Sequence, residues 1–179
     1  MSRFTLVTSN LHKIAEYKRL LPKTTDFNIQ KLDLDELQSL DPAIIVKHKV
    51  VEAYKKIGSP VVVEDVSAGI DKLGGLPGPF VKFFEQAIGP DALYVLGGDG
   101  AQATLTCTIG YYDGDNLFLC SGVLSGKVKA LSPNQGFGFD RVFVPGGAGD
   151  KTFADMTFQE KDKISHRKLA VDKLVRYLQ

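Results

Sequence analysis

Two segments in the last third of the chain place aromatic rings, an acid and cations at close spacing. The first is Gly136-Phe137-Gly138-Phe139-Asp140, and the second runs from Lys161 to Ser165-His166-Arg167. An aromatic ring beside an acid can hold a flat ligand by stacking and hydrogen bonding, and flanking glycines let the backbone approach it. The lysine and the His-Arg pair add donors for oxo groups and phosphate. Together they suggest a pocket for a nucleotide or nucleobase.

The aromatic and histidine side chains also have a simpler interpretation. Phe137, Phe139 and His166 could each be an ordinary core or hydrogen-bonded residue, as buried aromatic and histidine side chains often are. The Gly-Phe-Gly-Phe-Asp string is harder to explain in that way, because two glycines weaken a packed element unless the backbone must come close to something.

An early polar cluster, Thr8-Ser9-Asn10, lies where a predicted strand turns into a predicted helix. Backbone N–H groups at a helix start, together with the helix dipole, favour an anion such as phosphate. Lys13, one turn into that helix, can add a positive charge. The alternative is a simple helix cap followed by a solvated lysine.

Carboxylates at two places could bind a metal ion. The β-branched run 60–63 predicts a buried strand that delivers Glu64-Asp65 at its C-terminal end, where open α/β sheets bind ligands. Glu36 lies in the acidic run 33–36. Mg²⁺ prefers oxygen ligands and keeps several waters, so Glu36 and Asp65 with substrate phosphates would suffice. Taken alone, Glu36 could be an ordinary loop acid.

The elements that must position these residues alternate between apolar-periodic and β-branched segments. Asn10 or Ser9 can cap the first helix, and Asp41 can cap the second, with Pro42 at its first helical position. Strands are predicted over residues 4–8, 28–32, 60–63, 105–111 and 117–131, and helices over 11–21, 42–57, 80–87, 91–96 and 165–178. Because helices and strands mix without strict alternation, we expect a mixed α/β fold built around one elongated sheet.

The second predicted helix carries a candidate cation. Its apolar stripe recurs at helical spacing, and a neighbouring stripe contains Ile45, Lys49 and Glu52. Lys49 could therefore reach a cleft at the edge of the buried face.

The segment Gly97-Gly98-Asp99-Gly100 offers a competing interpretation. After the apolar run 93–96, it resembles the phosphate loop of lipid and NAD kinases, where a strand feeds a GGDG turn. That motif continues with threonine, whereas this chain has Ala101. Pro90-Asp91 also has the character of a helix start, which favours a plain loop here.

Composition limits the classes of protein that the chain can belong to. The 179 residues favour a single domain, and an apolar share of 44% is ordinary for a globular protein. A formal net charge of +1 gives no electrostatic footprint for nucleic acid or an anionic membrane surface. No apolar run is long enough to span a bilayer, and no secretion signal is evident, so we expect a cytoplasmic location. Cys107 and Cys120 are then expected to be reduced core thiols.

Several strings match the motifs of one family in the same order along the chain. They are Thr8-Ser9-Asn10-Leu11-His12-Lys13, Glu64-Asp65, Gly75-Leu76-Pro77-Gly78-Pro79-Phe80 followed by Lys82, Phe137-Gly138-Phe139-Asp140, Thr152-Phe153-Ala154-Asp155-Met156, and Lys161 with Ser165-His166-Arg167. On these strings the chain resembles the inosine triphosphate pyrophosphatase family over nearly its whole length. The Gly-Leu-Pro-Gly-Pro and Ser-His-Arg strings are the most specific.

The resemblance implies a sheet flanked by helices that forms two lobes with a central nucleotide-binding cleft, and a homodimer. It implies Mg²⁺-dependent hydrolysis of ITP, dITP or XTP to the monophosphate and pyrophosphate. Glu36 and Asp65 would hold the metal, Asp65 would orient or deprotonate water, Phe139 would stack on the base, and His166 and Arg167 would donate to its 6-oxo group. Lys49 best fits the substrate-facing lysine, with Lys47 as the alternative. The expected substrate-binding residues are Thr8, Ser9, Asn10, Lys13, Lys49, Phe137, Gly138, Phe139, Asp140, Lys161, His166 and Arg167.

The chain departs from the family pattern at several positions. Ser9 stands where the family usually has glycine, Val66 replaces a threonine or serine, and Arg141 replaces a proline. Phe139 replaces tryptophan or tyrosine but can still stack, and the segment before Gly136 lacks a frequent arginine. These changes leave two alternatives open: a nucleotide-binding protein that has lost turnover, and a pyrophosphatase for another modified or pyrimidine nucleotide.

Overall fold

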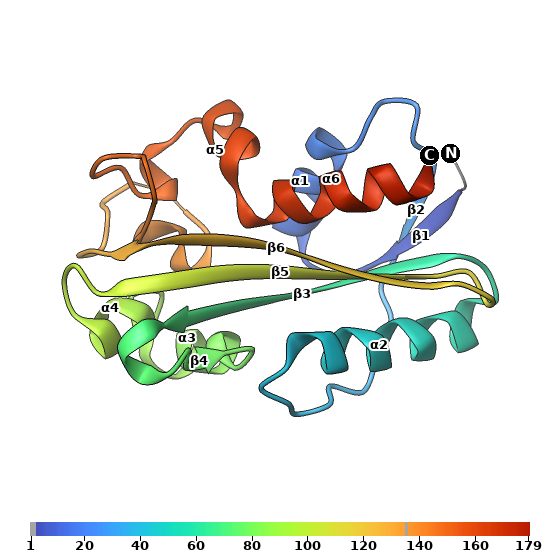
Figure 1. The fold of residues 1–179 in the computed structure, drawn as a ribbon, viewed down its shortest axis with the longest axis horizontal. Helices are drawn as coiled ribbons and strands as arrows, with labels where there is room; N and C mark the ends of the chain where they lie inside the picture. The colour runs from blue at the N-terminus through green and yellow to red at the C-terminus, as the bar shows by residue number, and fades with distance from the viewer. Residues whose placement is uncertain (1–2, 135) are drawn as a thin grey trace. The chain divides into compact units, whose positions relative to one another are not determined.

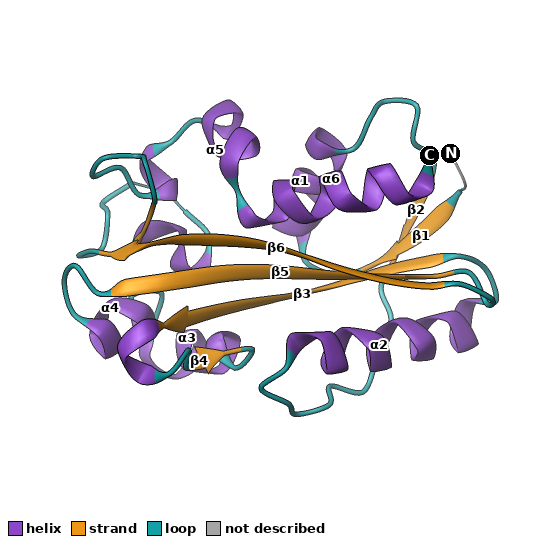
Figure 2. Cartoon of the chain, viewed as in Figure 1, coloured by secondary structure: helices purple, strands orange, loops and turns teal. Residues whose placement is uncertain are grey.

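The computed structural model describes residues 3–134 and 136–179, and its strands form one mixed sheet (Figure 2). The strands are β1 (Phe4–Val7), β2 (Phe27–Gln30), β3 (Val61–Ile70), β4 (Pro77–Gly78), β5 (Gln102–Tyr112), β6 (Leu117–Val128) and β7 (Phe143–Pro145). Their order is β2-β1-β3-β5-β6-β7, with β4 paired to β3. β1 runs parallel to β2 and β3, whereas β7 runs antiparallel to β6. This confirms the predicted mixed α/β class.

The chain forms two compact units, and Figure 1 labels its α-helices. One unit comprises residues up to 65, 107–122 and 167 onward, and the other comprises 66–106 and 123–166. The α-helices are α1 (Leu11–Leu20), α2 (Pro42–Ile57), α3 (Val81–Ile88), α4 (Ala92–Gly97), α5 (Phe158–Ile164) and α6 (His166–Leu178). The 3₁₀ turns are η1 (Asp71–Leu73), η2 (Gly138–Arg141) and η3 (Phe153–Asp155). Among the described residues, none of these helices has the length and apolarity required to cross a membrane.

The first unit packs α2 against the start of β3. Val46, Val50 and Ala53 of α2 are fully buried in a cluster with Val61 and Val63. Successive side chains of a strand point to opposite faces, so Val61, Val63 and Asp65 face α2. Figure 1 draws α1 and α6 on the other side of these strands, where Glu64 forms ion pairs with side chains of both helices.

The second unit has its own core. Buried residues from several elements make up this cluster: Ala68, Ile70, Val81, Leu93, Ala103, Leu105, Val128, Val142, Phe143 and Phe153. Gly126 of β6 pairs with Pro145 of β7, and a Cβ built on it would lie 2.6 Å from the Phe143 ring. The missing side chain at Gly126 therefore makes room for an aromatic ring of this core.

The predicted helix starts are confirmed by their caps. The Asn10 side chain accepts hydrogen bonds from the backbone N–H groups of His12 and Lys13, and Asp41 accepts from Ala43. Pro42 is the first residue of α2, as its fixed φ allows. Cys107 and Cys120 are both free thiols, as expected, but only Cys107 lies in the core, because Cys120 is partly exposed.

The prediction that a strand over 60–63 ends just before Glu64-Asp65 was wrong, because β3 continues to Ile70. Ser67 and Gly69 are weak strand formers, but the chain returns through β4 and pairs Pro77 and Gly78 with Gly69 and Ala68. A Cβ on Gly69 would lie 2.3 Å from the Gly75 carbonyl oxygen. The pairing of β3 with β4 therefore overrides the weak strand propensity of Ser67 and Gly69. It also makes Pro77 and Gly78 a short strand, β4, rather than part of a loop.

Other boundaries differ in smaller ways. β6 ends at Val128 rather than Leu131, and α6 begins at His166, because Ser165 ends the separate helix α5. The kinase alternative is excluded, since residues 93–96 are helical in α4 and no strand feeds the turn at 98–100. The turn at 98–100 is a plain loop, and α4 begins at Ala92, next to the helix start predicted at Pro90-Asp91.

Candidate active site

The turn between β1 and α1 forms the first part of the candidate site. The backbone N–H of Asn10 donates to the Thr8 hydroxyl at 3.2 Å, and Asn10 Oδ1 accepts from His12 and Lys13 at 2.9 and 3.2 Å. Ser9 is exposed between them. The structure therefore places Thr8, Ser9 and Asn10 together at the start of a ten-residue helix, as the sequence predicted.

Lys13 points from α1 toward β3. Its Nζ lies 3.1 Å from Glu64 Oε1 and 3.5 Å from the Glu64 carbonyl oxygen. The Lys13 side chain is one-fifth exposed, whereas that of Glu64 is almost completely buried. The lysine predicted to contact phosphate therefore also compensates a buried acid.

The two predicted metal ligands, Glu36 and Asp65, meet at one cation. Lys49 Nζ lies 3.3 Å from Glu36 Oε1 and 3.1 Å from Asp65 Oδ1. Burial lowers the pKa of Lys49, but the two carboxylates outweigh that effect and raise it above its usual value. Lys49 is therefore charged at neutral pH. Lys47, the alternative, is exposed on another face of α2, so Lys49 is the lysine that reaches these acids.

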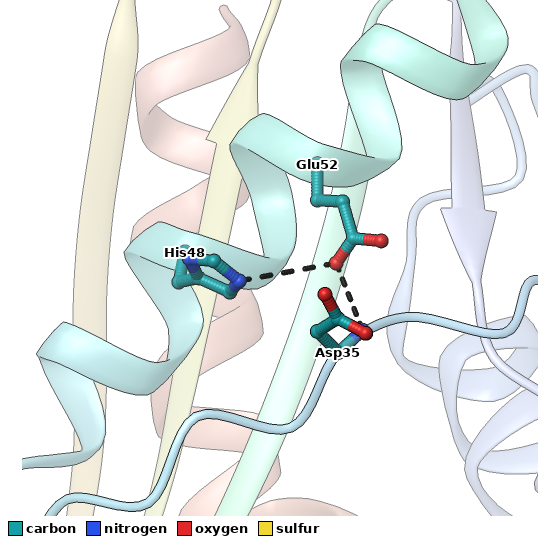
Figure 3. Close-up of side chains that lie close together, drawn as sticks. All are labelled: Asp35, His48 and Glu52. Atoms are coloured by element: carbon teal, nitrogen blue, oxygen red, sulfur yellow. Dashed lines mark hydrogen bonds and ion pairs between the residues drawn. The ribbon is translucent and has the colours of Figure 1, made fainter.

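A second set of side chains fixes the loop that carries Glu36. The backbone N–H of Asp35 donates to Glu52 Oε2 at 2.9 Å, and His48 Nε2 lies 4.0 Å from the same carboxylate (Figure 3). Lys56 Nζ contacts Glu52 Oε1 and the Asp33 carbonyl oxygen, both at 2.6 Å. Asp35, His48 and Glu52 offer ligand atoms within 4.8 Å of one another. Lys56 and the Asp35 backbone N–H already pair with the Glu52 carboxylate. We therefore interpret Asp35, His48 and Glu52 as contacts that hold the Glu36 loop against α2.

Arg167 lies in a buried ion cluster with two glutamates. Its Nε and Nη2 donate to Glu64 at 2.9 and 2.8 Å, and its Nη1 pairs with Glu16. The three side chains are at most one-tenth exposed. Burial alone would raise the pKa of Glu64, but Arg167 and Lys13 hold it well below its usual range. Three of the five N–H groups of the guanidinium are thus paired with carboxylates. The predicted hydrogen bond from Arg167 to a base would have to come from one of the other two.

The predicted base-binding aromatics lie in the second unit. Phe139 packs against the core there, and its ring centroid lies 5.9 Å from that of His166, which is 2% exposed. His166 also lies 6.3 Å from the ring of Phe153. Phe137, in contrast, is about half exposed.

Asp140 and Lys161 form a buried ion pair close to the Phe153 ring. Lys161 Nζ lies 2.7 Å from Asp140 Oδ2 and 5.2 Å from the centroid of the Phe153 ring. Both residues are 8% exposed. The structure therefore brings Gly138, Phe139, Asp140, Lys161 and His166 together within one unit, as their motifs predicted.

Sequence analysis missed two acids that contact these groups. Glu16 follows Lys13 by one helical turn, and that i,i+3 spacing could have revealed a shared face directed at Arg167. Glu85 of α3 reaches the turn at Gly138 and Phe139, with no sequence signal beyond an acid in an aromatic helix.

Known proteins resemble this chain over nearly all of its length. The model of the Ham1 family matches residues 4–177. An inosine triphosphate pyrophosphatase of Schizosaccharomyces pombe is 37% identical over 97% of this chain and 93% of its own length. Inosine triphosphate pyrophosphatase 2 of Trypanosoma cruzi is 39% identical over 94% of this chain and 88% of its own length.

Solved structures share the fold. The Staphylococcus aureus Ham1 protein aligns with a TM-score of 0.81 at 24% identity, over 99% of this chain and 98% of its own. A HAM1 protein from Coxiella burnetii aligns with a TM-score of 0.82 at the same identity and coverage. The family match and the close relatives agree with the motif order read from the sequence, and the chain belongs to the Ham1 family.

Proposed function

We propose that this protein hydrolyses ITP, dITP and XTP to the nucleoside monophosphate and pyrophosphate. The relatives named as inosine triphosphate pyrophosphatases support this activity at 34–39% identity. The observation that carries the proposal is the position of Lys49 Nζ between Glu36 and Asp65. Two acids and a charged lysine at one point form an arrangement suited to phosphate and a divalent cation.

The residues of the first unit would handle the phosphates. Water attacks the α-phosphorus, the bond to the bridging oxygen breaks, and pyrophosphate leaves with that oxygen. Asp65 would orient the water or accept its proton. Lys13 and Lys49, with backbone N–H groups of the β1–α1 turn other than those of Asn10, His12 and Lys13, would bind the triphosphate oxygens.

The carboxylates of Glu36 and Asp65 suit a hard divalent cation, because both already converge on the ammonium of Lys49. We propose Mg²⁺, which would neutralise charge on the phosphates and on the leaving pyrophosphate. Lys49 would then turn from the acids toward the phosphates.

Base recognition would fall to Phe139, His166 and Arg167. The Phe139 ring would stack on the purine, while the other two would donate to the 6-oxo group of hypoxanthine or xanthine. Adenine carries an amino group at that position, so it would leave buried donors unpaired. Sites built in this way discriminate by up to ~10⁴.

The test is pyrophosphate release from ITP, XTP, dITP, ATP, GTP and dUTP with Mg²⁺ at mildly alkaline pH. Fast release from the hypoxanthine and xanthine nucleotides alone is the expected result. Release mainly from dUTP would indicate a different substrate class. Binding of ITP by the folded protein without any release would instead support a nucleotide-binding protein that has lost turnover.

A further inference from the structure

Glu85 of α3 lies against the turn that presents Phe139. A Cβ built on Gly138 would lie 2.8 Å from Glu85 Oε1 and 3.2 Å from Oε2. The backbone N–H of Phe139 lies near enough to the Glu85 carboxylate to lower the pKa of that acid. The carboxylate therefore packs directly against the turn, and a side chain at position 138 would require Glu85 to shift.

The Glu85 carboxylate places a negative charge beside the turn η2, whose own N-cap side chain supplies none. Phe137 is the N-cap residue of η2 and makes no side-chain capping bond. The first N–H groups of a helical turn need acceptors from elsewhere, and a carboxylate is a strong one. Gly138 adopts φ +56°, a conformation that most side chains disfavour, so the backbone at the contact is closely specified.

The Glu85 carboxylate is held in an unusual environment. Its Oε1 atom is buried and makes no hydrogen bond within the part of the chain that the structure describes. Burial raises the pKa of Glu85 to about 7, the Phe139 N–H opposes that rise, and Asp140 adds to it. Asp140 is itself paired with Lys161 at 2.7 Å, so Lys161 is already committed to Asp140.

We propose that Glu85 is a positioning residue for base recognition, fixing the Gly138–Phe139 turn so that the Phe139 ring is set for stacking. The inference rests on the proposed function of that ring. Because Oε1 is buried and both carboxylate oxygens lie against Gly138, we assign Glu85 an action through the turn rather than on the base itself. An ionised carboxylate holds an N–H more strongly than a neutral acid does. The turn is therefore firmly held above neutral pH and loosens below it.

The decisive experiment measures KM and kcat for ITP between pH 6 and pH 8.5. In the unmodified protein, KM should rise roughly threefold to tenfold from pH 8 to pH 6, with a midpoint near the Glu85 pKa. The variant Glu85→Gln keeps an acceptor but cannot titrate, so its KM should be flat across that range while kcat changes less than about twofold. Gln86→Ala, at an exposed position on the same helix, should retain the full pH dependence.

If KM for ITP keeps its pH dependence in Glu85→Gln, the proposal is overturned. It is also overturned if kcat in that variant falls by as large a factor as KM rises. Glu85→Ala provides a second variant, in which weakened ITP binding at every pH is expected. If the unmodified protein hydrolyses no nucleotide, the proposed function fails. Glu85 is then tested by calorimetric binding of IMP at pH 6 and pH 8, and equal pH dependence in the unmodified protein and Glu85→Gln would overturn its role.

Discussion

Glu64 and Asp65 are consecutive residues of β3 whose carboxylates serve opposite faces of the sheet. Glu64 pairs with Arg167 and Lys13, whereas Asp65 pairs with Lys49 on α2. The alternation of side chains along a strand requires this separation. The two adjacent acids are therefore expected to have different functions, one in folding and the other in catalysis.

The first prediction concerns Asp65. Asp65→Asn should lower kcat for ITP by roughly 10²–10⁴-fold, because the amide can neither accept a proton nor bind a cation as a carboxylate does. The fold should survive, since Asp65 is only partly buried. Pyrophosphate release and the thermal unfolding midpoint together check this. The exposed Asp99, changed to Asn, is the matched control, and near-normal turnover in Asp65→Asn would remove this residue from the mechanism.

The second prediction concerns stability at Arg167. Arg167→Ala should lower the free energy of unfolding by about 3–5 kcal/mol, because it leaves Glu64 and Glu16 buried without their partner. Urea denaturation at pH 7 measures the loss. Adding Glu64→Gln to that variant should recover part of it, since one buried charge is removed. An unchanged unfolding free energy with a lost preference for ITP over ATP would instead make base recognition the main role of Arg167.

The third prediction is an acid dependence of stability that arises from Glu64. Its pKa is depressed in the folded protein from an ordinary value of 4.5. The stability that Glu64 contributes is therefore present above that pH and is lost as pH falls toward its folded pKa. Unfolding free energies measured between pH 7 and pH 3 should decline less steeply in Glu64→Gln, by up to about 1.4 kcal/mol per pH unit. Identical slopes would show that another group dominates acid unfolding.

The fourth prediction concerns the cation at Glu36 and Asp65. Chelation by EDTA should abolish pyrophosphate release, and Mg²⁺ should restore it much better than Ca²⁺, whose coordination is larger and looser. Equal rates with the two ions would argue against this metal role.

Lys49 offers a readout of the same cation site that does not depend on activity. Lys49→Met removes the resident ammonium, so the two acids should bind Mn²⁺ more tightly without nucleotide, by roughly tenfold if about 1.4 kcal/mol of competition is relieved. Calorimetry measures this affinity. Lys47→Met, which removes an exposed lysine of the same helix, should leave it unchanged.

Local signals were sufficient where one segment determines its own structure. The caps at Asn10 and Asp41 and the apolar stripe of α2 could be read directly from residue types and spacing. Glu36, Lys49 and Asp65 also lie together, but this grouping came from the family resemblance, and their roles toward a metal and phosphate stay predictions. In addition, α5 could have been predicted, because Thr157 and Glu160 form a capping box.

Features that depend on long-range pairing could not be predicted in this way. The extension of β3 past Asp65 depends on the return of Pro77 and Gly78, which only the folded chain brings alongside. The buried partnership of Arg167 with Glu64 joins residues about a hundred positions apart. Ion pairs of that kind leave no periodic trace in a single sequence.

The two units of the chain are each built from several separate stretches of sequence, which affects how the protein can change in evolution. The polypeptide crosses between the two units at residues 65/66, 106/107, 122/123 and 166/167, so neither unit is encoded by one uninterrupted stretch of gene. Three of these crossings fall inside β3, β5 and β6. A truncation before residue 166 would therefore remove parts of both units. The residues of the proposed site can then be changed by point substitution, but neither unit can be exchanged as one continuous segment.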